Sequence, residues 1–356
     1  MAYLVLDKEK LKHNFQFLDQ LFSTNEKSWA VVSKLLCGNR SYLEYLISLG
    51  PNELCDSRIS NLQTIKEINS QIKTVYIKPP AHDNIEDVVR YADTSFNTEL
   101  DTIRLLSEEA TRQNKVHKII IMIELGDLRE GIMGEDLIEF YGEVFHLKGI
   151  EVSGIGANLN CLSGVLPSQD KLIQLSLYEQ LIEANFNQQI PWVSGGTSIT
   201  IPLIERGQVP KGVNHFRIGE TLFFGNHLLE DTPYEGMEQG VIKLFAQIIE
   251  IAEKPKIPIG YLAENPSGEM HEVDEADYGE TSYRAIIDIG LLDISPEYLI
   301  PEDNEISVIG ASSDMIVLDL GEKEQSYSVG DMVSFRLKYM GALGIFNSDY
   351  IEKRII

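Results

Sequence analysis

Eight short apolar runs, separated by stretches with helical periodicity, dominate the first two thirds of the chain. Between the runs, apolar residues recur at helical spacing, as at Leu100, Ile103 and Leu106. Eight strands that alternate with helices over about 200 residues predict a closed parallel (β/α)8 barrel, that is, a TIM-type α/β fold. A doubly wound open sheet is the alternative, but no Gly-x-Gly-x-x-Gly motif opens the first strand–helix unit. The predicted strands are residues 29–33, 53–55, 74–78, 94–96, 118–125, 152–158, 192–194 and 215–218.

The pattern changes after about Gly225, where helical periodicity gives way to the alternating runs of an antiparallel sheet. We therefore expect a barrel domain over residues 1–228 and an all-β domain over residues 229–356. The first strand, residues 3–6, is expected to join the second domain, and a helix capped by Asp7 follows it. The alternating runs are 241–251, 283–289, 306–309, 315–320 and 332–337, with a long loop over 253–279.

Lys34 follows the first predicted barrel strand and leads into a turn at Gly38. An amine at the mouth of a barrel is partly desolvated, which favours its neutral, nucleophilic form. Such an amine can form an imine with an aldehyde, and pyridoxal phosphate is the cofactor that presents one. For this residue taken alone, an ordinary solvated lysine is the alternative.

Other polar residues fall at the ends of later predicted strands, where barrels of this kind place their chemistry. Arg129 follows the fifth strand, Asn158 ends the sixth and Arg217 lies in the eighth. The sequence Ser-Gly-Gly-Thr-Ser over residues 194–198 follows the seventh strand. Its glycines and hydroxyls suit a phosphate, because bare backbone N–H groups can approach an oxyanion. The joint order of these motifs indicates a phosphate-bearing cofactor at this end of the barrel.

These motifs resemble the fold-type III pyridoxal-phosphate enzymes typified by alanine racemase, and most closely the branch that contains ornithine racemase. The resemblance runs from about Tyr3 to the C-terminus. It implies an amino-acid racemase, in which two bases transfer the α-proton on opposite faces of the substrate. The segments that carry it are 31–38, 55–58, 126–131, 154–161, 194–198, 214–225 and 310–314.

The resemblance implies a role for each matching residue. Lys34 matches the Schiff-base lysine, which also acts as one proton-transferring base. Arg217 matches the arginine that faces the pyridine nitrogen, where a permanent cation keeps that nitrogen unprotonated. Arg129 matches the arginine that reaches the cofactor's phenolic oxygen and contacts the substrate. The other cofactor matches are Asn158 against the ring face and, around the phosphate, Ser198, Gly219 and Tyr339 with the backbone of Thr197 and Glu220.

One departure from the family pattern concerns Arg129. Met122 stands where alanine racemases often carry a modified lysine that orients this arginine. Arg129 must therefore be held differently, and Glu124 and Asp127 are the candidates. This change, together with the absence of a tyrosine in the loop after Lys34, fits the ornithine-type branch better than alanine racemase.

The resemblance places the second base and part of the substrate pocket on a partner subunit. Tyr261, in the sequence Ile-Gly-Tyr, matches the catalytic tyrosine, although the residues after it depart from the family pattern. A surface tyrosine is the alternative there, and Tyr283 is the reserve candidate. Ser313 and Asp314 match positions that line the substrate pocket from the partner. The implied active form is a homodimer with shared active sites.

Composition limits the partners and the setting. Lys and Arg number 30 against 55 Asp and Glu, so the net charge of −25 argues against nucleic acid or an anionic membrane as a partner. The chain has no apolar run of about 18 residues and no signal-peptide pattern at its start, so we expect a cytoplasmic protein. Its three cysteines lack a C-x-x-C spacing and its histidines lack paired spacing, so we expect no metal site.

We expect the substrate to be a basic amino acid such as ornithine or lysine. Its distal amine needs an anionic partner, for which Asp127, Glu220 and Asp314 are candidates. Alanine racemase is one alternative, and the lyases of the same fold, D-threonine aldolase and D-serine dehydratase, are another. A third alternative is a non-catalytic barrel that binds pyridoxal phosphate, but those barrels lack a second domain such as residues 229–356.

Overall fold

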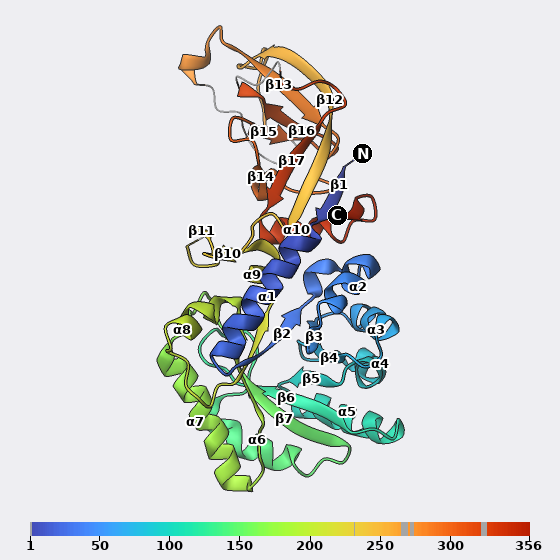
Figure 1. Ribbon diagram of the computed structural model, residues 1–356, viewed down its shortest axis with the longest axis vertical. Helices are drawn as coiled ribbons and strands as arrows, with labels where there is room; N and C mark the ends of the chain where they lie inside the picture. Colours follow the sequence, from blue (N-terminus) through green and yellow to red (C-terminus); the bar gives the residue numbers. More distant parts are fainter. Residues whose placement is uncertain (1, 231, 265–269, 271–273, 322–325) are drawn as a thin grey trace. The chain divides into compact units, whose positions relative to one another are not determined.

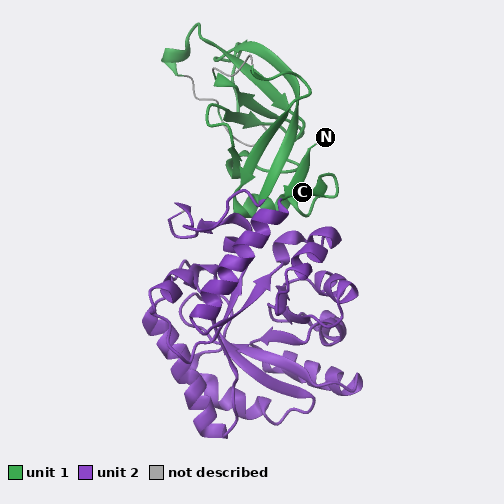
Figure 2. Ribbon diagram, in the orientation of Figure 1, with its two compact units in different colours: residues 1–6, 242–356 green, residues 7–241 purple. Residues whose placement is uncertain are grey.

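The computed structural model describes residues 2–230, 232–264, 270, 274–321 and 326–356. The chain forms two compact units (Figure 2). One unit contains residues 7–241, and the other contains residues 1–6 together with residues 242–356. The division therefore falls between Val241 and Ile242, and the first few residues belong with the C-terminal part of the chain.

The larger unit is a closed barrel of eight parallel strands, which confirms the fold predicted from the sequence (Figure 1). Neighbouring strands pair in the order β2 to β9, and β9 closes the ring by pairing Ser28 with His215 and Val31 with Ile218. The strands are β2 (Ser28–Val32), β3 (Glu53–Asp56), β4 (Lys73–Tyr76), β5 (Thr94–Asn97), β6 (His117–Met122), β7 (Ile150–Gly156), β8 (Trp192–Thr197) and β9 (His215–Ile218).

Helices follow the strands around the outside of the barrel, as expected of this fold (Figure 1). They are α1 (Lys8–Thr24), α2 (Arg40–Ser48), α3 (Ile59–Ile68), α4 (Ile85–Tyr91), α5 (Leu100–Arg112), α6 (Leu137–Val144), α7 (Gln169–Phe186), α8 (Ile201–Glu205) and α9 (Glu220–Phe224). A short ribbon of β10 (Asn226–His227) and β11 (Thr232–Pro233) follows α9.

The first helix shows why the local sequence folds as it does. The Asp7 carboxylate accepts a hydrogen bond from the backbone N–H of Lys10, which confirms the predicted N-cap. Leu11, Phe15, Leu18 and Phe22 lie on one buried face of α1. Burial of each such side chain is worth about 1.5–3 kcal/mol, so this apolar stripe fixes α1 against the barrel.

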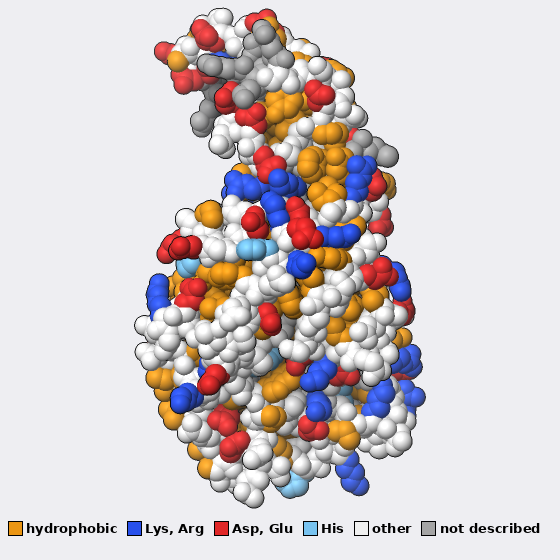
Figure 3. Space-filling model, in the orientation of Figure 1, with side chains coloured by type: hydrophobic (Ala, Val, Ile, Leu, Met, Phe, Trp, Pro, Cys, Tyr) orange, Lys and Arg blue, Asp and Glu red, His pale blue; other side chains and the backbone are white. Residues whose placement is uncertain are grey.

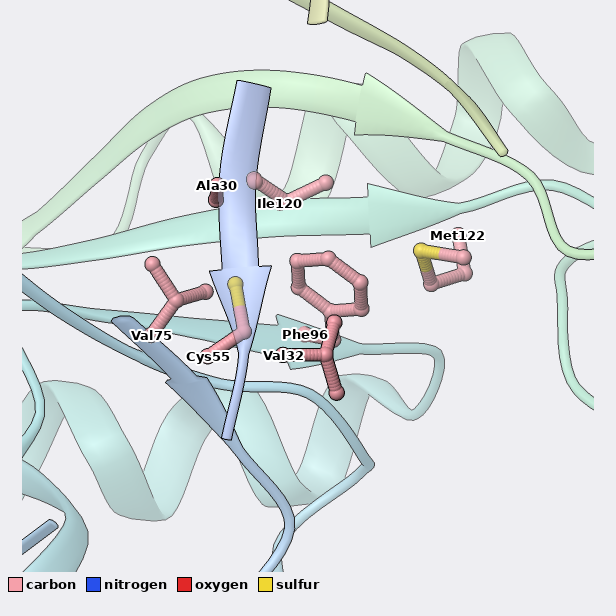
Figure 4. Packing of buried hydrophobic residues seen from close by; sticks show 7 residues of the cluster. All are labelled: Ala30, Val32, Cys55, Val75, Phe96, Ile120 and Met122. Carbon is pink, nitrogen blue, oxygen red and sulfur yellow. The ribbon is translucent and has the colours of Figure 1, made fainter. Parts of the chain in front are cut away.

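Apolar side chains fill the interior of the barrel. Figure 4 shows this cluster, in which side chains from successive strands point toward one another. Phe96 and Met122 are its large members near the ends of β5 and β6. The cluster packs the β2 to β6 side of the interior, and in barrels of this fold the chemistry lies in the loops at the strand ends. The cluster consists of Ala30, Val32, Cys55, Val75, Phe96, Ile120 and Met122.

The smaller unit is built on a mainly antiparallel sheet, as predicted. Its long strand β12 ends at Pro255, so it includes the first three residues of the loop predicted over 253–279. The N-terminal strand β1 (Tyr3–Leu6) pairs antiparallel with β12 and parallel with β18. The remaining elements are β12 (Ile242–Pro255), β13 (Thr281–Ile287), β14 (Leu299–Pro301), β15 (Ser307–Ala311), β16 (Ile316–Asp319), β17 (Met332–Leu337), α10 (Tyr339–Ile345) and β18 (Glu352–Ile355).

Acidic and basic side chains are interspersed over the face of the molecule drawn in Figure 3.

In the described part of the chain, no helix combines the length and the apolar character needed to cross a bilayer. Helix α7 buries Leu172 and Leu175 but exposes Leu177 and Leu181, so only some of its leucines are buried.

A buried histidine makes the stability of the barrel depend on pH. His117, the first residue of β6, is 2% exposed, and its Nε2 lies 2.8 Å from the Ser95 hydroxyl. Burial lowers the pKa of His117 from 6.5 to about 4. The unfolded chain therefore binds more protons than the folded chain between these values, so stability falls as the pH drops through this window, by up to about 3 kcal/mol.

We predict that His117→Gln makes the free energy of unfolding less sensitive to acid. Urea titrations at about pH 7 and about pH 4.5 measure the loss for each protein. The variant should lose about 2 kcal/mol less than the parent on acidification, because it has no buried imidazole to protonate. His146→Gln is the control, since His146 is exposed. Equal losses in the parent and in His117→Gln would contradict the prediction.

Candidate active site

Lys34 stands at the carboxyl end of β2, two residues after the strand ends at Val32. It begins a single helical turn, Lys34–Leu36, and its carbonyl accepts the N–H of Cys37, which has a left-handed φ of 48°. Lys34 is half-buried. Its backbone is thus held by the strand before it and by the tight turn after it.

A buried carboxyl group supports the residue before Lys34. The Ser33 hydroxyl donates to Asp56 Oδ2 at 3.0 Å, and Asp56 Oδ1 accepts from the backbone N–H of Arg58 and the side chain of Asn61. Burial raises the pKa of Asp56 to about 6, although these hydrogen bonds oppose the rise. Asp56 therefore ties the exit of β2 to the exit of β3.

Backbone N–H groups converge on one hydroxyl where β8 and β9 end. Ser198 Oγ accepts from the N–H of Gly219 at 3.3 Å and from the N–H of Thr221 at 3.4 Å. The neighbouring Thr200 hydroxyl is buried and has no hydrogen-bond partner. A Cβ on Gly219 would lie 3.1 Å from Val32 Cβ, so the chain after β9 passes close beside the strand that carries Lys34. Backbone N–H groups that converge where β8 and β9 end suit an anion, because barrels of this kind commonly bind a phosphate in the loops after their seventh and eighth strands.

Arg217, on β9, is the buried cation of the site. It is 2% exposed, and burial lowers the pKa of its guanidinium to about 10, so it stays charged at neutral pH. Its Nη2 donates to the carbonyl of Ala157 at 2.9 Å and to the side-chain oxygen of Asn158, and its Nη1 donates to the Ser194 hydroxyl. The guanidinium carbon lies 5.1 Å from the centre of the Phe96 ring.

A polar chain extends from Arg217 into the barrel wall. Ser194 Oγ accepts from Arg217 and lies 2.8 Å from His215 Nδ1, within hydrogen-bond distance. The other ring nitrogen of His215, Nε2, lies 3.5 Å from Glu53 Oε2. Burial lowers the pKa of His215. A buried carboxylate, Glu53, therefore lies behind Arg217, beyond Ser194 and His215.

Arg129 and Asn158 are joined by a residue that was not among the sequence predictions. Glu130 accepts hydrogen bonds from both Nε and Nη2 of Arg129, the second at 2.5 Å, and from the Asn158 side-chain amide. Asn158 in turn accepts from Arg217. Arg129, Glu130, Asn158 and Arg217 therefore form one continuous network across the exits of β6, β7 and β9.

The prediction that Glu124 or Asp127 holds Arg129 is wrong. Glu124 Oε1 instead accepts the backbone N–H groups of Gly126 and Leu128. Both oxygens of Asp127 accept backbone N–H groups from the loop after β7, at 2.9–3.3 Å. Burial alone acts to raise the pKa of Asp127, but these donors outweigh it and hold the pKa below its ordinary value. The donors are Cys161, Leu162, Ser163 and Val165.

The other predicted cofactor residues of this unit lie at the same end of the barrel. Thr197 is the last residue of β8 and pairs with Arg217 in the sheet register. Glu220 is the first residue of α9, directly after Gly219. Met122, at the end of β6, belongs to the apolar cluster of the interior. Among the described residues, no group of three or more His, Cys, Asp or Glu side chains is arranged to hold a metal ion.

The remaining predicted residues belong to the smaller unit. Tyr261 is fully exposed, and Tyr283 on β13 is 39% exposed. Ser313 and Asp314 lie between β15 and β16, where the Ser313 hydroxyl donates to Asp314 Oδ2 at 2.8 Å. Tyr339 is the first residue of α10. For these residues the roles implied by the resemblance remain predictions.

The family follows from the barrel sequence. Residues 6–227 match the model of the alanine racemase N-terminal domain, which spans the whole barrel and more than half of the chain. The chain belongs to the alanine racemase family. The residues of the candidate site, from Lys34 to Thr221, all lie within the matched range.

Two family relatives match over nearly their full lengths. A protein of Acetoanaerobium sticklandii named ornithine racemase is 37% identical over 354 residues, which cover 99% of both chains. A protein of Thermotoga maritima named lysine racemase is 30% identical over 350 residues, which cover 98% of this chain and 97% of the relative. Both matches include the smaller unit as well as the barrel.

Solved structures agree on the fold. An alanine racemase of Clostridium difficile 630 superposes with a TM-score of 0.78 at 15% identity, and the match covers 100% of this chain and 95% of that chain. A D-threonine aldolase of Filomicrobium marinum superposes with a TM-score of 0.70 at 13% identity, over 96% of this chain and 88% of that chain. At these identities the similarity establishes the architecture shared by the family and by the aldolase.

Sequence reasoning missed four members of the site: Glu53, Glu130, Ser194 in its role toward Arg217, and His215. The signal for Glu130 was its position beside Arg129 within the same loop. The signal for His215 was weaker, namely a polar residue at the start of a short buried strand, two positions before Arg217. Because residues two apart on a strand point to the same face, both side chains of β9 turn toward the polar chain.

We predict that Asp127→Asn loosens the loop after β7. An asparagine amide would direct its NH2 group at two of the four backbone donors, so those hydrogen bonds are lost. Hydrogen–deuterium exchange followed by mass spectrometry should show exchange at least about tenfold faster in peptides over residues 159–166. Peptides from α5 are the internal control. Unchanged exchange over residues 159–166 would contradict the role assigned to Asp127.

Proposed function

We propose that this chain is a pyridoxal-phosphate-dependent amino-acid racemase that acts on amino acids with a distal amine, such as ornithine or lysine. The observation that carries the proposal is the full-length relationship to two racemases whose names specify those two amino acids. The fold and the polar residues at the barrel mouth are consistent with it.

The residues of the barrel mouth fit pyridoxal phosphate. The phosphate fits the site of Ser198, Gly219 and Thr221, where the N–H groups of Gly219 and Thr221 converge on the Ser198 hydroxyl. Lys34 supplies the amine that holds the aldehyde carbon. When bound, the cofactor withdraws electrons from the substrate α-carbon and so acidifies its proton.

Arg217 governs the electronic character of the bound ring. Its pKa of about 10 keeps it protonated at neutral pH, and its hydrogen bonds to Ser194, Ala157 and Asn158 fix its orientation. If Arg217 faces the pyridine nitrogen, as the resemblance implies, this fixed cation would only donate to it and would keep it unprotonated. Lys34 moves a proton at the α-carbon from one face, and we assign the opposite face to Tyr261 of a second copy of the chain.

The substrate preference rests on charge. A substrate with a distal amine carries an extra positive charge, and a protein of net charge −25 attracts it. Asp127 is an unsuitable partner for that amine, because both of its oxygens are occupied by backbone donors. Glu220, at the start of α9, and Asp314, in the smaller unit, remain the proposed anionic contacts.

The experiment that tests the proposed function is α-proton exchange in heavy water across both enantiomers of the common amino acids. We predict that the enzyme exchanges and racemises ornithine or lysine with kcat/KM at least about tenfold higher than alanine. Lys34→Ala should abolish both the exchange and the cofactor absorbance near about 420 nm. A chelator control tests whether a metal contributes. Clear preference for alanine would overturn the substrate assignment, and full activity in Lys34→Ala would overturn the mechanism.

A second prediction tests the shared site. Tyr261→Phe should lower kcat by at least about 100-fold, because it removes the proton-transferring hydroxyl. When Lys34→Ala and Tyr261→Phe chains are co-expressed, mixed dimers contain one site with both bases, so activity should return to about a quarter of the wild-type value. Each variant expressed alone is the control. If the mixture is as inactive as its components while mixed dimers form, the two bases do not come from different subunits.

A further inference from the structure

We propose that Glu130 is the residue that positions Arg129 and Asn158 for the cofactor, and that it replaces the modified lysine found in other family members. The inference deepens the proposed function and rests on it. Glu130 is a positioning residue, because it acts through the two side chains that it holds.

The first observation is its pair of contacts with Arg129, through both Nε and Nη2. Two parallel N–H···O bonds fix the plane of a guanidinium, which a single contact does not.

The pair differs from an ordinary surface ion pair. The side chain of Glu130 is 12% exposed, whereas that of Arg129 is 40% exposed. The carboxylate therefore lies on the inner side, and the arginine reaches outward from it. A carboxylate that is largely buried must be paired, and Arg129 supplies the opposite charge.

The second observation is the contact between Glu130 and Asn158. The Asn158 amide donates to Glu130 and its oxygen accepts from Arg217, so each end of the amide faces a group of the matching kind. The carboxylate and the guanidinium thereby exclude the flipped orientation of the amide. Glu130 thus links both arginines of the site through one asparagine.

The loop around Glu130 is built to hold it still. The two ends of the loop are joined, because Glu124 N–H donates to the Ile132 carbonyl at 3.0 Å and Ile132 N–H donates to the Met122 carbonyl at 2.8 Å. Gly131 has φ of +149°, and a Cβ there would lie 2.3 Å from the backbone nitrogen of Glu124. Only glycine allows this close approach, so the loop is pinned directly beside Glu130.

The other acidic residues of the loop cannot perform this task. Glu124 and Asp127 accept backbone N–H groups and shape the loops after β6 and β7. Met122 is buried in the apolar cluster and offers no charge. Among the described residues, Glu130 is therefore the acid that contacts Arg129.

The test compares Glu130→Gln and Glu130→Asp with a matched control, Glu135→Gln, which changes an exposed glutamate nearby. Glutamine keeps the size of Glu130 but has one acceptor oxygen, and its NH2 group would face a donor of Arg129 or Asn158. We expect the holoenzyme of Glu130→Gln to lose pyridoxal phosphate at least about tenfold faster during dialysis, followed at about 420 nm. Glu130→Asp should recover part of this loss, and Glu135→Gln should match the wild type.

A double-mutant cycle separates positioning from a merely structural role. If Glu130 acts through Arg129 as well as through Asn158, adding Glu130→Gln to Arg129→Ala should lower cofactor retention by a smaller factor than Glu130→Gln does in the wild type. Thermal unfolding of the cofactor-free chains should be the same for Glu130→Gln and Glu135→Gln. Independent, multiplicative effects, or equal cofactor retention in these two variants, would overturn the inference while leaving the proposed function standing. A wild-type enzyme that binds no pyridoxal phosphate would overturn both.

Discussion

The site depends on one buried cation. Arg217 is taken out of water by the strands around it, and burial of a charge is tolerated only when its donors are satisfied. The neighbouring strands supply the acceptors. Ser194 on β8 accepts one hydrogen bond from Arg217, and Ala157 and Asn158, just after β7, accept two more. The Phe96 ring lies 5.1 Å from the guanidinium carbon. The proposed cofactor site therefore depends on closure of the barrel, because the acceptors of Arg217 come from strands that meet only in the closed ring.

The acidic residues near the barrel mouth have separate tasks, which their surroundings determine. Asp127 is enclosed by backbone N–H groups and ties two loops together. Asp56 joins the exits of β2 and β3 beside the proposed Schiff-base lysine. Glu130 faces a guanidinium and an amide, and Glu53 stands behind His215. A carboxylate thus connects two loops, connects two strands or pairs with an arginine, depending on which hydrogen-bond donors the fold places beside it.

Much of the fold could be predicted from the sequence, and the site only in part. All eight barrel strands were located, and the N-cap at Asp7 was correct, because both depend on neighbouring residues along the chain. The holder of Arg129 was not found. Glu124, Asp127 and Glu130 share one loop and one chemistry, and the choice between them depends on where loop backbone N–H groups point. Leu128, with its left-handed φ of 57°, and Gly131 turn the chain so that Glu130 faces Arg129.

The order of strands and helices by itself determined the barrel, and with it the edge at which polar residues gather, because parallel strands present their carboxyl ends together. It also determined the family, since the motifs occur in a specific order along the chain. Only the tertiary structure decided which charges are paired. Pairing depends on distances of a few ångströms between loops far apart in sequence, such as the one that brings Asn158 to Glu130, and on burial, which makes an unpaired charge too costly to keep.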